Sequence, residues 1–65
     1  MNDNDIRKQL ELEYGQVWNT SELTIDFQVI GFMAPMVRVI RKSDNIKGTL
    51  LFDHMPRFYY GFIAD

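Results

Sequence analysis

The sequence predicts one small α+β domain, in which one or two N-terminal helices pack on a three-stranded antiparallel β-meander. Residues 4–14 carry apolar side chains at helical spacing, whereas residues 36–63 contain three β-branched and aromatic segments separated by turn residues. Nine of the 65 residues are aromatic, which excludes intrinsic disorder. A chain of this length forms a single domain, residues 1–65, and residues 1–3 are expected to be a flexible terminus.

The first helix is predicted over residues 4–14, NDIRKQLELEY. Asn4 or Asp3 can cap its first N–H groups, and Gly15 stands where helices commonly end in a left-handed conformation. Its apolar side chains recur at intervals of four and share one face. They are Ile6, Leu10 and Tyr14.

Residues 19–27, NTSELTIDF, fit two kinds of secondary structure. Asn19 followed by Glu22 resembles a capping box, and Leu23 and Phe27 are helically spaced. Ile25 and Phe27 also alternate with polar residues, which is the spacing of a strand. A short helix is preferred, a strand over 20–28 is the alternative, and GFMAP (31–35) is expected to be a connector that ends in proline.

Three strands are predicted in the C-terminal half, each rich in β-branched and aromatic residues. They are MVRVIRK (36–42), GTLLFD (48–53) and RFYYGFI (57–63). A two-residue type I′ turn at Asp44-Asn45 and a second turn at 54–57 set their register. The resulting cross-strand pairs are Val39 with Leu50, Val37 with Phe52, and Phe52 with Phe58.

Because side chains alternate along a strand, this register divides the sheet residues between two faces. One face is apolar throughout and is the expected core, covered by the helical residues. It carries Val37, Val39, Leu50, Phe52, Phe58, Tyr60 and Phe62. The opposite face mixes polar with large apolar side chains, although a solvated face should be mostly polar. It carries Arg38, Ile40, Lys42, Thr49, Leu51, Asp53, Arg57, Tyr59 and Ile63.

The second face is the predicted partner-binding surface, because apolar residues and a tyrosine flanked by arginines are typical of interface hot spots. The candidate binding residues are Arg38, Ile40, Leu51, Arg57, Tyr59 and Ile63. Met33 and Met36 can extend this patch. The alternative is that the second helix or the N-terminal segment covers the face. Since 65 residues leave little chain to cover two faces, we expect a homodimer that also binds another protein.

The residues predict no catalytic site, metal site or cofactor. His54 is the only histidine, there is no cysteine, and the spacing gives His54 no partner for acid–base catalysis. Lys47-Gly48-Thr49 resembles the end of a P-loop but lacks the upstream glycine and the following helix. We therefore expect a protein that is not an enzyme, with a site assembled between subunits as the remaining catalytic alternative.

Charge is unevenly distributed and bears on a possible nucleic-acid ligand. Residues 1–28 hold six acidic and two basic residues, whereas residues 29–64 hold five basic and two acidic residues. Single-stranded nucleic-acid binding is the alternative function, with bases stacking on Tyr59 beside Arg38 and Arg57. The pI of 5.1 weighs against it, because a net-negative protein gains little from counterion release.

The start of the chain, MNDNDIRKQL, is too polar for a signal peptide, and no apolar run approaches the length of a membrane span. A cytoplasmic protein without membrane association is therefore expected.

Two stretches, DFQVIGFMAP and VRVIRKSDNIKGTLLFDHMPRFYYGF, resemble small uncharacterised proteins of bacteriophages and environmental bacteria. The resemblance spans residues 13–63. Its most specific pattern is K-S-D-x-x-x-G…F-x-H-x-P-R-x-Y, formed here by Lys42, Ser43, Asp44, Gly48, Phe52, His54, Pro56, Arg57 and Tyr59. The resemblance implies an accessory protein and carries over no functional residue.

The leading hypothesis is a non-enzymatic protein-binding module. If the chain is phage-encoded, it would bind and modulate a host protein in the host cytoplasm, or serve as a small structural or assembly component of a virion.

Overall fold

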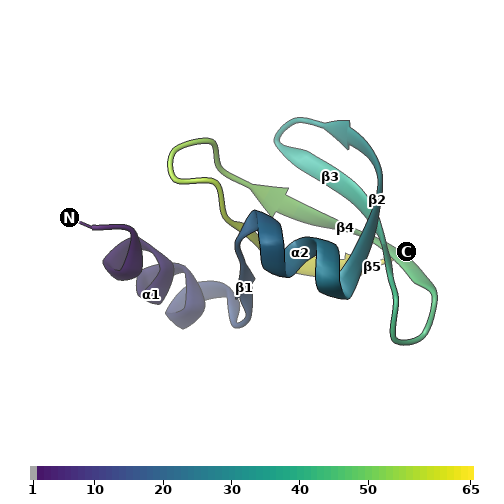
Figure 1. The fold of residues 1–65 in the computed structure, drawn as a ribbon, viewed down its shortest axis with the longest axis horizontal. Helices are drawn as coiled ribbons and strands as arrows, with labels where there is room; N and C mark the ends of the chain where they lie inside the picture. The colour runs from purple at the N-terminus through teal and green to yellow at the C-terminus, as the bar shows by residue number, and fades with distance from the viewer. Residues whose placement is uncertain (1) are drawn as a thin grey trace.

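The computed structural model describes residues 2–65 and contains two helices and an antiparallel five-stranded sheet (Figure 1). The elements are α1 (Asp3–Tyr14), β1 (Val17–Trp18), α2 (Thr20–Asp26), β2 (Phe27–Met33), β3 (Met36–Arg41), β4 (Ile46–Phe52) and β5 (Tyr59–Ala64). The strand order is β1-β5-β4-β3-β2. The α+β class is confirmed. The predicted meander corresponds to β3, β4 and β5, and β1 and β2 extend it at both edges. Met1, part of the terminus expected to be flexible, lies outside the described residues.

Helix α1 begins one residue earlier than predicted, because Asn2 caps it. The Asn2 side chain accepts a hydrogen bond from the Asp5 amide at 2.9 Å. The predicted caps, Asp3 and Asn4, are therefore helical residues. Gly15 ends the helix as predicted. Its φ of 85° and ψ of −129° differ from the left-handed helical conformation that was expected, but this region too is readily adopted only by a residue without a Cβ.

Both patterns noted around residues 19–28 are present, in consecutive elements. A capping box starts α2, because the Asn19 side chain accepts from the Glu22 amide and the Glu22 side chain accepts from the Asn19 amide. The helix ends at Asp26, and the alternation that starts at Phe27 continues as β2. The preferred short helix is therefore correct up to Asp26.

The predicted connector over residues 31–35 is mostly strand. Strand β2 continues to Met33, and only Ala34 and Pro35 remain as the turn before β3. One extra residue between Val29 and Gly31 forms a bulge, so the glycine lies within a strand and does not end it.

The hairpin between β3 and β4 has a four-residue loop, 42–45, in place of the predicted two-residue turn. Only Asn45 has a positive φ, 58°, whereas a type I′ turn requires two such residues. Val39 consequently lies opposite Gly48 and not Leu50. This shift of two residues leaves each side chain of β3 and β4 on its predicted face, because faces alternate with a period of two.

The register of β5 differs from the prediction by one residue, which exchanges the faces of two tyrosines. Phe52 lies opposite Tyr59, so Tyr59 points into the core and Tyr60 points to the opposite face. A bulge at Gly61, which has a φ of 68°, then adds one residue and returns Phe62 to the core face.

Apolar side chains form one cluster on each face of the sheet. The main core lies between the sheet and α2 and contains Trp18, Leu23, Phe27, Val37, Val39, Leu50, Phe52 and Tyr59. The second cluster lies where α1 meets β1 and β5 and contains Val17, Phe58 and Tyr60, with Ile6, Leu10 and Leu51 packed against it. The apolar residues of α1 were predicted to pack on the main core, and this prediction is wrong. Ile6 and Leu10 pack against the second cluster, on the side of the sheet away from α2.

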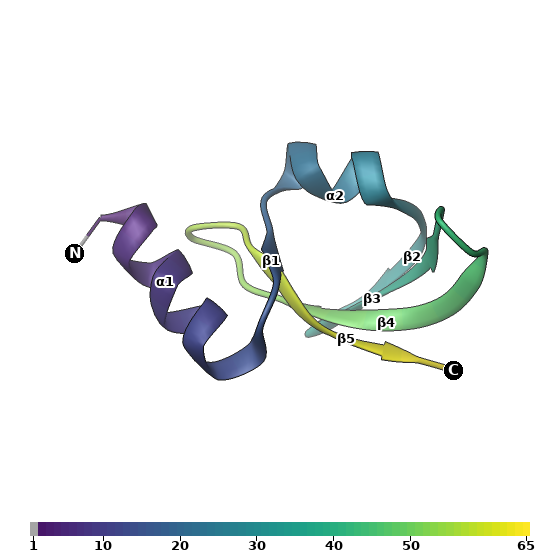
Figure 2. The same cartoon turned by 90° about the horizontal axis from the view of Figure 1, so that it is seen from below.

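Figure 2 shows how unequally the two faces are covered. Helix α2 lies over one face, and α1 lies beyond β1 at the end of the sheet. Coverage of the second face by α1 is limited to its β1–β5 end. Within residues 2–65, neither helix lies over the β3–β4 part of that face.

Tyr60 makes the stability of the second cluster sensitive to alkaline pH. Burial, followed by a hydrogen bond that its hydroxyl donates to Asp53 at 2.9 Å, raises the pKa of Tyr60 from 10.0 to about 12. Folding thus favours the protonated phenol. This stabilisation should be fully present below pH 10 and should be lost as the pH rises from 10 to about 12.

Phenolate absorbance should show an ionisation step near pH 12, and Tyr60→Phe should remove it. The same variant should lose less stability between pH 10 and 12 than the wild type. A wild-type titration with no step near pH 12, or with a step that Tyr60→Phe leaves unchanged, would contradict the prediction.

Candidate functional site

Beyond α1, the second face is a continuous surface of three side-chain rows, at whose margin Leu51 also packs against the second cluster. The sheet register defines them, because directly paired residues share a face. The first row is Met33, Met36 and Leu51; the second is Gly31, Arg38, Thr49 and Ile63; the third is Gln28, Ile40 and Lys47. We call the central seven residues the open face. They are Met33, Met36, Arg38, Ile40, Thr49, Leu51 and Ile63.

The open face is mostly apolar and accessible, with Arg38 and Thr49 as its polar members. Ile63 is 69% exposed and Met33 is 59% exposed, and Ile40 and Leu51 are only partly buried. All these side chains project from strands, so the surface is preformed. Single exposed apolar residues are ordinary, but a contiguous group on one face is typical of an interaction site.

The charge within the open face is balanced inside the chain. Arg38 crosses β4 to reach Asp65, and its Nη2 lies 2.8 Å from Asp65 Oδ2. Both side chains remain more than two-fifths exposed, so the pair contributes little to stability. Its effect is to leave the middle of the open face without an unpaired charge.

The structure brings four of the six predicted binding residues together. Arg38, Ile40, Leu51 and Ile63 all lie on the open face. Tyr59 does not: it is 2% exposed, its ring lies 6.0 Å from that of Phe52, and it belongs to the main core. The prediction that placed Tyr59 on the second face is therefore wrong, because the β4–β5 loop shifts the register by one residue.

Arg57 also lies away from the open face. Its guanidinium stacks over the Phe52 ring at 5.0 Å, on the core side of the sheet. One terminal nitrogen lies 3.1 Å from His54 Nδ1, and the other donates to the Tyr59 hydroxyl at 3.4 Å. Arg57 and His54 thus hold the β4–β5 loop against Phe52, and the interpretation of Arg57 as a second-face residue is wrong.

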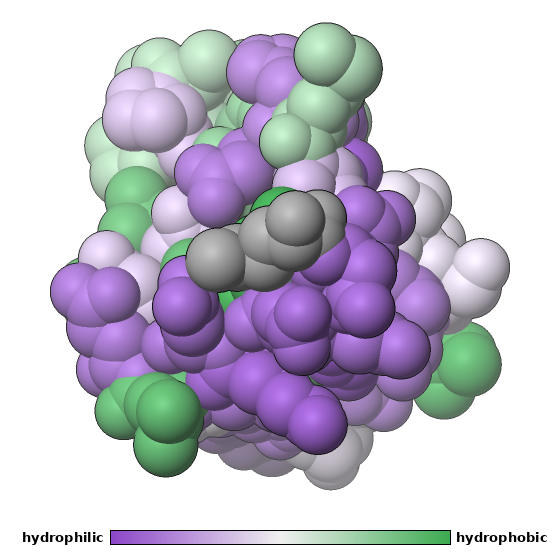
Figure 3. Space-filling model, turned by 90° about the vertical axis from the view of Figure 1, so that its left-hand side faces the viewer, coloured by the Kyte–Doolittle hydropathy of each residue, from purple (hydrophilic) through white to green (hydrophobic). Residues whose placement is uncertain are grey.

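The end of the molecule that α1 occupies is more hydrophilic than the open face. Its centre and lower part are mostly hydrophilic, with hydrophobic residues mainly near the margins of the view (Figure 3). Leu12, which is 89% exposed, lies on α1 away from the open face. Leu12 is therefore an exposed apolar residue that is not part of the open face.

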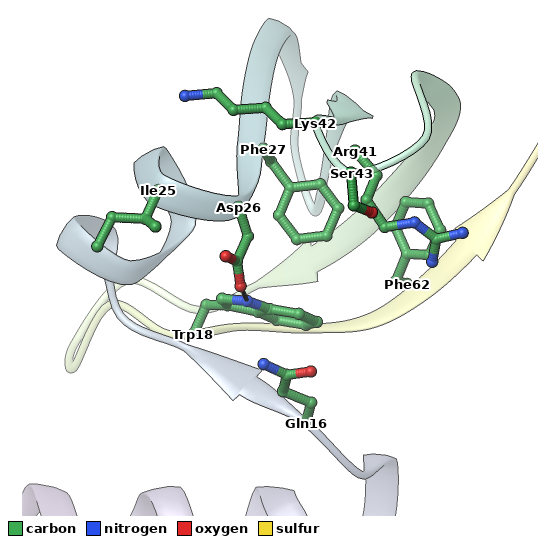
Figure 4. A pocket seen from close by; sticks show the side chains of 9 residues that line it. All are labelled: Gln16, Trp18, Ile25, Asp26, Phe27, Arg41, Lys42, Ser43 and Phe62. Carbon is green, nitrogen blue, oxygen red and sulfur yellow. Dashed lines mark hydrogen bonds between the residues drawn. The ribbon is translucent and has the colours of Figure 1, made fainter.

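A cavity of about 550 Å³ lies on the other side of the sheet, between α2 and the 42–45 loop (Figure 4). Three aromatic rings line it: Trp18 meets Phe27 edge-on at 5.1 Å, and Phe27 lies 5.3 Å from Phe62. Polar side chains surround these rings. They are Gln16, Asp26, Arg41, Lys42 and Ser43, and Ile25 completes the lining.

Sequence reasoning missed this cavity, because its residues come from four separate segments. No spacing rule connects Gln16 and Trp18 to the end of α2, the 42–45 loop or Phe62. The one local signal is that Trp18 is the only tryptophan in the chain. Aromatic residues with a polar handle commonly lie at the boundary of a core and a site.

Comparisons with protein-family models, curated proteins and solved structures found no match. Among residues 2–65, no group of three or more histidine, cysteine, aspartate or glutamate side chains is placed to hold a metal ion. In the same part of the chain, no helix combines the length and apolar character needed to cross a membrane.

Proposed function

We propose that the chain is a non-enzymatic protein-binding module whose open face binds a second copy of the same chain. The observation that carries the proposal is the contiguous apolar surface on β2–β5 that neither helix covers within residues 2–65. A domain of this size has a core that supplies only ~3–5 kcal/mol, so burial of a second face would add substantially to its stability.

Charge supports a second copy as the occupant. Because Arg38 is already paired with Asp65, the seven residues of the open face carry no unpaired charge. Lys47, beside Ile40 at the margin of this surface, forms no ion pair within residues 2–65. A two-fold symmetric dimer brings the same patch of both subunits together, and a patch that is apolar and internally neutral is compatible with itself. The edge strand β2, FQVIGFM, has no charged residue and exposes Ile30, whereas the exposed Phe32 lies on the core side of the sheet against Phe52.

The nucleic-acid alternative loses its structural basis. It requires Tyr59 as an exposed stacking platform, and Tyr59 is 2% exposed. Of the arginines expected beside it, Arg38 is paired with Asp65 and Arg57 stacks on Phe52. None of the seven open-face residues is aromatic, and Tyr60, which shares this side of the sheet, is buried in the second cluster under α1.

Replacement of Ile63 by lysine tests the proposal. Ile63→Lys leaves the monomer intact, because the side chain is 69% exposed, but places a charge in the interface of each subunit. We expect the dimer dissociation constant, measured by sedimentation equilibrium, to rise at least tenfold, which corresponds to about 1.4 kcal/mol. Leu12→Lys is the matched control, since Leu12 is exposed outside the open face and its replacement should leave dimerisation unchanged.

Two outcomes would contradict the proposal. The first is a wild-type protein that stays monomeric up to millimolar concentration. The second is an equal loss of dimer in Leu12→Lys and Ile63→Lys, which would show that any added lysine disturbs association. Circular dichroism of both variants checks that the monomer fold is retained.

A further inference from the structure

Asp26 supplies the cavity with a carboxylate whose orientation is fixed. Its Oδ2 accepts a hydrogen bond from Trp18 Nε1 at 2.8 Å, and Trp18 is itself held in the main core (Figure 4). The indole carries no charge. Within residues 2–65, no basic side chain forms an ion pair with Asp26. Asp26 therefore presents a negative charge that the chain itself does not balance.

The two basic residues of the cavity are engaged elsewhere. Arg41 donates from Nε and Nη2 to the two carboxylate oxygens of Asp44, at 3.1 and 2.8 Å. Lys42 donates from Nζ to the Thr24 carbonyl oxygen at 2.7 Å, and in Figure 4 its side chain points away from Trp18. Lys42 has no carboxylate partner within residues 2–65, but its side chain is directed away from Trp18, so the unmatched charge beside the indole is the Asp26 carboxylate.

The aromatic lining also favours a cation. Ring faces attract positive charge, most strongly that of tryptophan. The Arg41 guanidinium already lies 4.8 Å over the Phe62 ring, so one ring face in the cavity accommodates a cation. The cavity volume of about 550 Å³ lies within the ~300–1,000 Å³ typical of small-molecule sites.

We propose that this cavity binds an organic cation with an apolar body. An ammonium or guanidinium group would lie beside Asp26, and the body would contact Ile25, Phe62 and the accessible part of Trp18. The group could belong to a free amine or to a lysine or arginine side chain of a polypeptide, which share this chemistry. The site lies on the opposite side of the sheet from the open face, so it stands independently of the proposed dimer.

Trp18 provides a direct measurement, because the only tryptophan of the chain has one indole N–H signal in NMR spectra. The probes are phenethylammonium, the uncharged 2-phenylethanol and the anionic 3-phenylpropanoate, which share a phenyl body. We expect a saturable shift of the indole signal with phenethylammonium, and at least tenfold weaker binding of the other two probes.

Asp26→Asn isolates the contribution of the charge. The asparagine oxygen can still accept the indole hydrogen bond, so the variant should fold, but it should bind phenethylammonium and 2-phenylethanol equally. Asp5→Asn makes the same replacement on the exposed surface of α1 and should keep the tenfold preference. The comparison of probes on the wild type needs no variant, so the test holds even if Asp26→Asn fails to fold.

A further probe tests whether the bound cation is a free amine or a side chain of a polypeptide. Tighter binding of Nα-acetyl-lysine methylamide than of phenethylammonium would identify a polypeptide side chain, and the reverse order a free amine. The proposal is overturned if the wild type shows no saturable shift, binds the alcohol as tightly as the ammonium, or prefers the anion. It is equally overturned if a folded Asp26→Asn protein keeps the preference for the ammonium.

Discussion

Tyr59→Ala is expected to unfold most of the protein at room temperature. Tyr59 is 2% exposed, pairs with Phe52 and Trp18 in the sheet, and fills the centre of the main core. Truncation of a buried aromatic side chain to alanine costs ~3–5 kcal/mol. A single core in a chain of this size supplies only about that amount. Far-UV circular dichroism and urea unfolding should show loss of the cooperative transition.

Tyr59→Phe is the matched control, because it keeps the ring and removes only the hydroxyl. That hydroxyl accepts a long hydrogen bond, 3.4 Å, from Arg57. Its loss should lower the free energy of unfolding by about 1 kcal/mol or less. A Tyr59→Ala protein as stable as the wild type would mean that this residue lies on the surface, as the sequence pattern alone suggests.

Gly48→Ala should be the most damaging small substitution in the sheet. A Cβ at Gly48 would lie 2.5 Å from the Ile63 carbonyl oxygen and 2.7 Å from two atoms of the Phe62 ring. Because the first of these is a backbone atom, β5 itself would have to move. Overpacking of this kind typically costs ~1–3 kcal/mol, which is a large part of the stability of so small a domain.

Gly31→Ala provides the comparison for Gly48→Ala. A Cβ at Gly31 meets no atom within 4 Å, so alanine should be tolerated and can stabilise the strand by ~0.5–1 kcal/mol through the unfolded state. Thermal unfolding of both variants, followed by circular dichroism, should therefore give opposite shifts. An unchanged midpoint for Gly48→Ala would show that β4 and β5 do not approach as closely as described.

Prediction succeeded where local rules decide the structure. The start of α2 at Asn19 and the end of α1 at Gly15 follow from capping and from the φ of glycine. The continuation of β2 through residues 31–33 was predicted as a connector, because Gly31 and Pro35 are breaker residues by local rules. Both are tolerated here, since the glycine follows a bulge and the proline occupies a two-residue turn.

Among the residues predicted for the second face, local alternation also placed some correctly and failed for others. Arg38 and Ile40 alternate with the buried Val37 and Val39 along β3, whatever the length of the 42–45 loop. A change of two residues in that loop also leaves the side chains of β4 on their predicted faces. The predicted face of Tyr59, in contrast, depends on the exact length of the β4–β5 loop. A shift of one residue in the β4–β5 loop, followed by the bulge at Gly61, reverses the two tyrosines and leaves Phe62 in place.

The sequence by itself determined the α+β class, the helix that Gly15 ends, and the alternation of buried and exposed residues along β3 and β4. Each depends on contacts or conformations within a few residues. Only the tertiary structure decided which tyrosine is buried, which face α1 covers, and that Trp18 and Asp26 share a cavity with the 42–45 loop. These outcomes depend on the register and packing of distant segments, which local spacing does not specify.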